Sequence, residues 1–325
     1  MAKELDAHVD GSGQTPRALT SGPRSGVETT VARMGWMISA AGLLVVLVAL
    51  WDIFHTLWHP GGFGRIARWV FQLVWWATKH VLPSHTRQLA GPIGILGTVA
   101  LWTGLVVIGW TLVYLPHMSD GFYFGSALRP EQSSDALTAL YLSLVTVATL
   151  GFGDVTPADP VLRLLAPFEA LLGFVLLTAA ISWILQVYPA LGRRRSVAKR
   201  LSILNSTHAS HVVAGGDSCV ASRMLDAVTD GVIQAETDLL QYAESYYFIE
   251  EEEDLSLAAT LSYALEMAEA GRGSSSREVH LAAGMLTAAV ESLASRLDRT
   301  YLNTGAAAPE VLASYGADHG FEPHA

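Results

Sequence analysis

The sequence predicts an all-α membrane protein that ends in a helical soluble domain, and three observations support this fold class. Of the 325 residues, 51% are hydrophobic and only 15% are charged, whereas soluble chains have about 25% charged residues. Long, nearly uncharged runs lie between residues 35 and 190. After residue 192 the composition is that of an ordinary soluble domain, with apolar residues at helical spacing.

We predict four parts in chain order. Residues 1–34 are rich in Gly, Ser, Thr and Arg, show no hydrophobic period and are expected to be disordered. Residues 35–91 are expected to hold a transmembrane helix (about 35–58) and an amphipathic helix. Residues 92–192 contain two further spans, about 92–115 and 160–188, separated by a half-length apolar stretch and a glycine motif. Residues 193–325 are expected to form an acidic helical domain.

The segment 64–82 differs from the spans because its uninterrupted apolar run is short. One face of a helix here would be polar, with Arg65, Arg68, Gln72 and Lys79. The other face would carry Ile66, Trp69, Val70, Leu73, Trp76 and Val81. This pattern favours a helix lying at the membrane surface. The alternative is a spanning helix of unusual polarity.

Positive charges set the expected orientation. Arg193, Arg194, Arg195, Lys199 and Arg200 directly follow the last span, and such clusters mark cytoplasmic ends. The glycine motif would then open from the outside, and the C-terminal domain would be cytoplasmic. The N-terminus lies outside if segment 64–82 is interfacial, and inside if it spans.

The glycine motif, residues 146–154, is suited to coordinating a cation. A pore must replace the water oxygens around an ion without holding the ion too tightly, and backbone carbonyls serve this purpose. Pointing successive carbonyls the same way needs unusual backbone angles, which Gly151 and Gly153 tolerate. The Thr149 hydroxyl would add an oxygen at the inner end. Leu150 and Phe152 would point away from the axis and pack behind the loop.

The residues before the motif predict a short helix aimed at the same point. Ser133, Ser134 and Asp135 are good N-cap residues. A mainly apolar stretch, 136–148, follows. The C-terminal end of this helix would face the pore centre, where its dipole favours a cation.

The run Thr-Val-Ala-Thr-Leu-Gly-Phe-Gly-Asp at 146–154 resembles the signature of tetrameric potassium channels, and the resemblance covers about residues 93–190. It implies a homotetramer, in which three further copies of the chain complete one K⁺ path. The filter residues implied are Thr149, Leu150, Gly151, Phe152 and Gly153. Asp154, Thr146 and Glu169 are expected to support the filter. Gly173 stands where the family commonly has an inner-helix hinge, although a glycine there also permits close helix packing. More distantly, residues 51–57 resemble bacterial potassium channel family proteins with extra N-terminal helices.

The chain departs from the family pattern behind the filter. Leu150 and Phe152 replace the commoner valine or isoleucine and tyrosine, and Val145 stands where some members carry a glutamate. Tyr141 and Leu142 replace a frequent Trp pair. Glu169, an ionisable group at membrane depth, is a functional candidate. It would either supply the carboxyl that position 145 lacks or face water near the outer end.

Three further patterns have both a functional and a structural interpretation. Asp52, His55 and His59 share a helix face and could bind a metal or protons, or simply cap and pair. The acidic run 250–254 lacks the spacing of a calcium loop and is expected to be a solvated surface. Residues 211–217 weakly resemble the start of a dinucleotide-binding domain, which we reject because the full glycine pattern is missing.

The C-terminal domain has a possible assembly seam. Val279, Ala283, Leu286, Val290, Leu293 and Leu297 follow heptad-like spacing. They would pack within the tail or, alternatively, form a tetramer-stabilising bundle. Residues 217–325 hold 19 acidic and 5 basic residues, which argues against nucleic acid as a partner. The one cysteine, Cys219, excludes an intrachain disulfide.

The expectation from sequence is therefore a multi-pass cell-membrane K⁺ channel subunit and not an enzyme. Its partners would be the lipid bilayer and its own copies, with no organic cofactor and no identified tail ligand. Two alternatives stay open, a weakly selective cation channel and a membrane sensor or scaffold with a structural pore unit.

Overall fold

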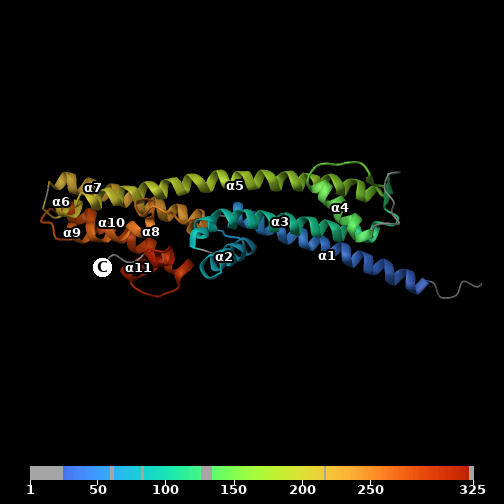
Figure 1. The fold of residues 1–325 in the computed structure, drawn as a ribbon, viewed down its shortest axis with the longest axis horizontal. Helices are drawn as coiled ribbons and strands as arrows, with labels where there is room; N and C mark the ends of the chain where they lie inside the picture. The colour runs from blue at the N-terminus through green and yellow to red at the C-terminus, as the bar shows by residue number, and fades with distance from the viewer. Residues whose placement is uncertain (1–24, 59–61, 82–83, 126–133, 216, 322–325) are drawn as a thin grey trace, which may run out of the picture.

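The computed structural model describes residues 25–58, 62–81, 84–125, 134–215 and 217–321. They form an elongated molecule, with long helices running from one end to a compact helical tail at the other (Figure 1). Among these described residues, three helices are long and apolar enough to cross a membrane, at Arg33–Leu57, Thr86–His117 and Pro160–Ser206. The all-α membrane fold predicted from the sequence is confirmed.

The first two spanning helices are α1 (Ser25–Leu57) and α3 (Ala90–Tyr114), which pack side by side and antiparallel. Two glycines let them approach closely. A Cβ on Gly42 would lie 2.4 Å from the Gly109 carbonyl oxygen, and small residues are what membrane helices use at such contacts. Ser39 Oγ also donates to the Val113 carbonyl at 3.1 Å. The helix of α1 begins at Ser25, earlier than the predicted span, while residues 1–24 lie outside the described chain.

Helix α2 (Arg65–His80) lies where the spans meet the tail (Figure 1). At 16 residues it is not among the three spanning helices. It packs on α3, and Phe71 fits against Gly94, where a Cβ would come within 2.4 Å of the ring. A 3-10 turn, η1 (Ser84–Leu89), leads into α3.

The segment between α3 and the last span contains the glycine motif. It runs through η2 (Leu115–His117), β1 (Phe122–Phe124), α4 (Asp135–Val147) and β2 (Val155–Pro157). The strands pair antiparallel, with Tyr123 opposite Thr156. As predicted, α4 is a short helix, and Ser134 caps it by accepting the Leu137 N–H at 3.3 Å. It lies at the end of the molecule opposite the tail, near the beginning of α1 (Figure 1).

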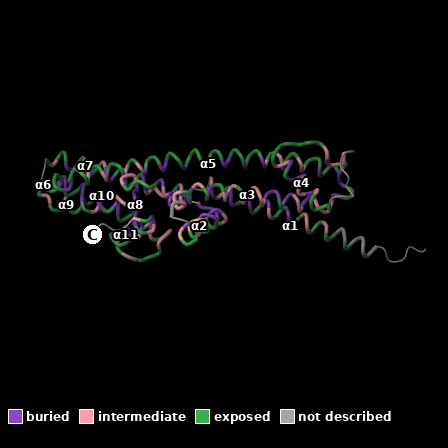
Figure 2. The backbone as a smooth tube through the Cα atoms, viewed as in Figure 1, coloured by how far each residue is buried: buried purple, intermediate pink, exposed green. Residues whose placement is uncertain are grey.

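The last span, α5 (Pro160–Ser206), continues without a break into the tail, so the predicted boundary at residue 192 falls inside one helix. Its side away from α3 is exposed along most of its length (Figure 2). Pro189 lies inside the helix and removes one backbone hydrogen bond there.

The tail is helical, as predicted. Its elements are α6 (Ala209–Gly215), α7 (Ser218–Gln241), η4 (Ala243–Tyr247), η5 (Glu253–Leu255), α8 (Leu257–Thr260), α9 (Ser262–Arg272), α10 (Arg277–Leu297), the π-turn Asp298–Leu302 and α11 (Ala308–Asp318). All six residues of the heptad-like seam on α10 are buried, and α10 packs against α7, α9 and α11 of its own chain. The seam therefore packs within the tail and is not free for a bundle. Residues 211–215 lie in α6, not in a strand.

Candidate functional site

The backbone of the glycine loop alternates in handedness. Thr149, Gly151 and Gly153 have φ of 57°, 54° and 75°. A positive φ is energetically costly for residues other than glycine. A chain that alternates in this way turns successive peptide carbonyls toward a common side, as a carbonyl-lined ion path requires.

All five residues of the loop, 149–153, are exposed in the single chain. Leu150 is 59% exposed and Phe152 64%. We expected these two side chains to pack behind the loop, but their own chain provides no such cover. Large exposed apolar groups of this kind are typical of an interaction surface.

The loop starts directly at the C-terminal end of α4. Thr149 N–H donates to the Thr146 carbonyl at 2.9 Å, and Leu150 N–H donates to the Val145 carbonyl at 2.9 Å. The negative end of the helix dipole therefore lies at the start of the loop. The Thr146 hydroxyl donates to the Leu142 carbonyl within α4 at 2.8 Å, so this side chain stabilises the helix and does not bond to the loop.

Asp154 is held by a phenol that sequence reasoning did not assign. Tyr141 OH donates to Asp154 Oδ2 at 2.6 Å, and the Val155 N–H donates to Oδ1 at 3.1 Å. The Asp154 carbonyl accepts the Gly125 N–H at 2.7 Å. The departure from a Trp at position 141 was the available signal, because a tyrosine there can still donate to the aspartate.

Glu169 is fully buried and joins three helices. Tyr114 OH on α3 donates to its Oε2 at 2.6 Å, and Ser143 Oγ on α4 donates to its Oε1 at 2.5 Å. The Ser143 hydroxyl also lies 3.1 Å from the Val107 carbonyl oxygen. The Glu169 carboxyl thus faces the middle of helix α4 and not water, and the side chain that contacts Asp154 is Tyr141.

Gly173 on α5 meets the end of α4. A Cβ at this position would lie 2.0 Å from the Val147 carbonyl oxygen. Any side chain would push the last span away from the helix that carries the loop. This contact supports the packing explanation for this glycine, and a hinge here stays a prediction.

Asp52 is a structural anchor at the α1–α2 corner. Its carboxylate accepts the N–H groups of Ile66 (2.9 Å) and Ala67 (3.2 Å) at the N-terminus of α2, and Trp102 Nε1 donates to it at 2.9 Å. These bonds correspond to the capping interpretation, and His59 lies outside the described residues. No cluster of three potential metal-binding side chains occurs in the part of the chain that the structure describes.

A pair of tryptophans links this corner to the tail. Trp102 on α3 and Trp183 on α5 have ring centroids 5.5 Å apart. Trp183 Nε1 donates to Glu244 in η4, and that carboxyl is buried. The buried carboxyl of Asp52 therefore holds the Trp102 indole, and the buried carboxyl of Glu244 holds the Trp183 indole. Burial raises the Glu244 pKa to about 7.

The basic cluster after the last span binds the tail. Arg193 makes a two-bond pair with Asp238 at 2.8 and 2.6 Å. Arg194 is buried and donates to the carbonyls of Ser245 and Phe248.

The acidic run is the partner of this cluster. Arg195 lies 2.9 Å from Glu250, and Lys199 pairs with Asp254. The prediction that 250–254 is a solvated surface is wrong for Glu250, whose side chain is mostly buried against Arg195 because the tail folds back along α5, whereas residues 251–253 are exposed.

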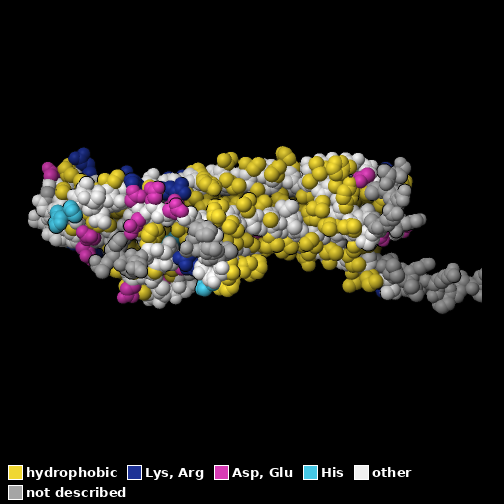
Figure 3. Space-filling view, in the orientation of Figure 1, with side chains coloured by type: hydrophobic (Ala, Val, Ile, Leu, Met, Phe, Trp, Pro, Cys, Tyr) yellow, Lys and Arg dark blue, Asp and Glu magenta, His cyan; other side chains and the backbone are white. Residues whose placement is uncertain are grey.

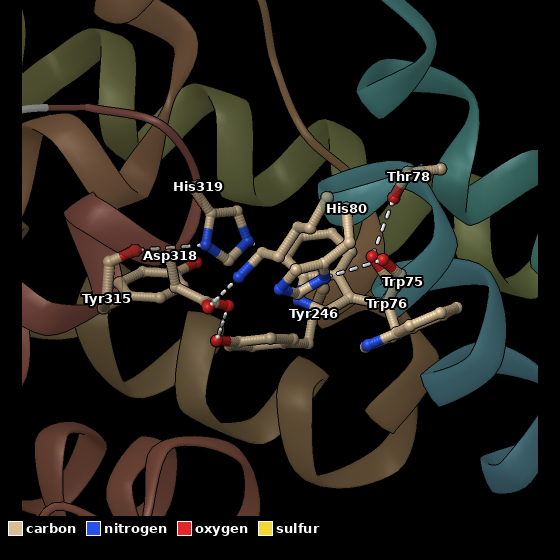
Figure 4. A network of polar contacts seen from close by, with 9 residues as sticks. Trp75, Trp76, Thr78, His80, Tyr246, Tyr315, Asp318 and His319 are labelled. Atoms are coloured by element: carbon tan, nitrogen blue, oxygen red, sulfur yellow. Dashed lines mark hydrogen bonds and ion pairs between the residues drawn. The ribbon is translucent and has the colours of Figure 1, made fainter. Parts of the chain in front are cut away.

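Helix α2 is bonded to the C-terminal helix α11 (Figure 4). Lys79 pairs with Asp318, which also accepts a 2.6 Å bond from Tyr246 OH. His319 Nε2 lies 2.8 Å from the Tyr246 carbonyl oxygen, and the ring packs against Trp75 at 5.4 Å. Burial lowers the His319 pKa to about 4, so the imidazole is neutral near pH 7.

Comparison with known proteins identifies the same region. Residues 100–188, which contain α4, the loop and most of α5, match a family model described as "Ion channel". Together with the three candidate spanning helices, this match describes an all-α membrane protein in which residues 100–188 are similar to ion channels.

Three relatives are partial matches. The chain is 29% identical over 173 residues to the uncharacterized membrane protein YdjJ of Bacillus subtilis (strain 168), covering 52% of this chain and 48% of YdjJ. It is 33% identical over 109 residues to Two pore potassium channel c of Oryza sativa subsp. japonica, covering 29% and 24%. It is 29% identical over 103 residues to Protein LctB of Geobacillus stearothermophilus, covering 30% and 73%. The chain thus spans about half of YdjJ and a quarter of the rice protein. No solved structure matches it significantly.

Proposed function

We propose that the chain is one subunit of a homotetrameric, potassium-selective channel. The observation that carries the proposal is the alternation of left-handed backbone at Thr149, Gly151 and Gly153. Four such loops around an axis would present rings of carbonyl oxygens and one ring of threonine hydroxyls to a dehydrated ion. The similarity to a plant protein named as a potassium channel is consistent with this ion.

The need for several copies follows from what one chain leaves uncovered. A single loop cannot surround an ion. The exposed side chains of Leu150 and Phe152 need a second surface. Helix α5 also exposes large apolar groups, among them Phe168, Phe174 and Ile181. Symmetric association of four copies would cover these groups and close the carbonyl rings.

We further propose that the loop opens to the outside and that the tail is cytoplasmic. The loop and the beginning of α1 lie at one end, and the tail lies at the other (Figure 1). With three spans and α2 on the inner surface, the N-terminus would be outside. Gating would move the part of α5 nearest the tail, which the tail holds through Trp183, Arg193 and Arg194.

The test is K⁺ flux through purified full-length protein in liposomes, with Na⁺ substituted, for wild type and Gly151→Ala. An alanine at φ of 54° is strained by about 1–2 kcal/mol in each subunit, so K⁺ flux should vanish. Gly284→Ala is the matched control, because a Cβ there meets nothing within 4 Å.

Each outcome has a distinct meaning. K⁺ flux far above Na⁺ flux that is lost only in Gly151→Ala supports the proposal. Equal K⁺ and Na⁺ flux would replace it with a weakly selective cation channel. Undiminished selective flux in Gly151→Ala would show that the loop is not the filter. Absence of flux with an intact tetramer would favour the scaffold alternative.

A further inference from the structure

Helix α2 exposes a continuous half of its surface. The exposed residues are Arg65, Arg68, Trp69, Gln72, Leu73, Trp76 and His80. At about 100° of rotation per residue, the polar positions 65, 68 and 72 form one sector, and the apolar positions 69, 73 and 76 form the adjoining sector. Trp69 is 59% exposed and Trp76 54%. The two sectors together are the pattern of a helix at a boundary between water and hydrocarbon.

The opposite half of α2 is fully used by the chain itself. Ala67, Val70, Phe71 and Thr78 are buried. Phe71 packs on Tyr247 at 5.3 Å and on Trp183 at 6.3 Å between ring centroids. The orientation of α2 is therefore fixed by α3 and the tail, and its exposed half must face outward.

The surroundings of this exposed half indicate what it contacts. In Figure 3, the hydrophobic surface of the spanning helices continues over α2, and most of the charged side chains lie over the tail, with a few at the opposite end of the molecule. Residues 59–91 contain four basic residues, Arg65, Arg68, Lys79 and Arg87, and no acidic residue. Lys79 is paired with Asp318, which leaves Arg65 and Arg68 on the exposed half.

We propose that α2 is a docking site for anionic phospholipid headgroups at the cytoplasmic surface of the bilayer. Arg65 and Arg68 contact the lipid phosphates, while Trp69, Leu73 and Trp76 enter the boundary with the acyl chains. Arginine suits phosphate because its planar fork donates several hydrogen bonds at once. The placement at the cytoplasmic surface rests on the orientation proposed above.

Lipid binding here would also act on the tail. On its other side the same helix forms an ion pair with Asp318 through Lys79 and packs Trp75 against the rings of Tyr246 and His319 (Figure 4). A lipid that fixes α2 at the surface therefore favours the docked tail, because a ligand stabilises the state that presents its site.

The first experiment measures lipid binding to the full-length chain without any flux. Delipidated protein in detergent is titrated with phosphatidylglycerol or phosphatidylcholine, and retained lipid is counted by native mass spectrometry. Wild type should prefer phosphatidylglycerol, and Arg65→Gln/Arg68→Gln should weaken that preference by about 30-fold, given the usual contribution of two basic residues near an anionic surface. The control Arg223→Gln/Arg277→Gln removes equal charge from exposed tail positions and should leave binding unchanged.

A second measurement tests the depth of α2. Because Cys219 is the only cysteine, a Cys219→Ser/Leu73→Cys chain can carry one environment-sensitive dye. Its emission should shift to the blue in nanodiscs compared with the lipid-free protein.

Two results would overturn the proposal. One is a preference for phosphatidylglycerol that survives in Arg65→Gln/Arg68→Gln. The other is a dye emission in nanodiscs that shows no blue shift relative to the lipid-free protein, either because the dye remains in water or because a second copy already covers this face without lipid. Neither depends on whether the protein conducts ions, so loss of the channel function would be seen separately.

Discussion

At the scale of single residues, two hydrogen-bonded contacts hold the loop and the helix before it in place. Tyr141 holds the carboxylate that follows the loop, and the bond is 2.6 Å long. Glu169 joins helix α4 to α3 through Ser143 and Tyr114. Buried polar groups satisfied in this way fix one arrangement of the surrounding helices.

Removing the Tyr141 hydroxyl tests the first contact. Tyr141→Phe keeps the ring but leaves Asp154 with only the Val155 N–H on its carboxylate. The outer end of the loop should lose rigidity, and the K⁺-to-Na⁺ flux ratio should fall severalfold with tetramer content unchanged. Tyr123→Phe, an exposed phenol on β1, is the control. An unaltered flux ratio in Tyr141→Phe would show that Asp154 does not need this donor.

A substitution at Gly173 distinguishes a role in helix packing from a role as a hinge. Gly173→Ala places a Cβ within 2.0 Å of the Val147 carbonyl, and such overpacking costs about 1–3 kcal/mol. The thermal unfolding midpoint of the purified protein should fall. Gly104→Ala on α3, where a Cβ meets nothing within 4 Å, should not lower it. A Gly173→Ala protein of normal stability with altered open probability would instead favour the hinge.

At the scale of elements, the tail is fastened to the membrane helices by three separate contacts. The turn η4 contacts Trp183 through Glu244. The basic cluster on α5 binds the tail acids. Helix α2 binds the end of α11. Because α5 runs unbroken from the loop region to Ser206, a movement of the tail reaches the last span directly.

The buried carboxyl of Glu244 gives the docked tail a pH dependence. Its pKa is raised from 4.5 to about 7 by burial, so the folded state holds this proton more tightly than the unfolded state does. The stability from protonated Glu244 is complete below about pH 4.5 and is lost as pH rises through about 7. Compared with wild type, Glu244→Gln should therefore gain stability as pH rises across this window, by up to about tenfold in the folding equilibrium per pH unit.

The measurement is the difference in thermal midpoint between the two proteins in detergent as a function of pH. Taking the difference removes the opposite contribution of His319, whose lowered pKa costs stability as pH falls. Glu236→Gln, which breaks a pair with Arg296 inside the tail, is the control for loss of a carboxylate. A difference that does not change with pH would mean that Glu244 is not buried in solution.

Local features of this chain can be predicted from its sequence, whereas contacts between distant residues cannot. Spans, the α4 cap at Ser134 and the glycine loop were predictable because their signals lie within a few residues. The Trp183–Glu244 and Tyr141–Asp154 bonds join residues 61 and 13 positions apart, and no local pattern pairs them. The environment of Glu250 was not predictable for the same reason, because whether a charge faces water or an arginine is decided by the tertiary fold.

At the scale of the whole molecule, the proposed topology of three spans with α2 on the inner surface would place the two ends of the described chain on opposite sides of the membrane. In the Cys219→Ser background, Thr30→Cys should react with a membrane-impermeant maleimide applied to intact cells. The native chain, whose exposed cysteine lies on α7, should react only after permeabilisation. Labelling of both from the same side would mean that α2 also spans.

Each chain contributes one loop, and this has a genetic consequence. If four loops share one ion path, a subunit with a defective loop but intact helices would still assemble and would block conduction in every tetramer that contains it. In cells that make normal and Gly151→Ala chains in equal amounts, random mixing leaves only about one in sixteen assemblies entirely normal. Conductance would then fall much further than by half, and a single altered gene copy would act dominantly over the normal one.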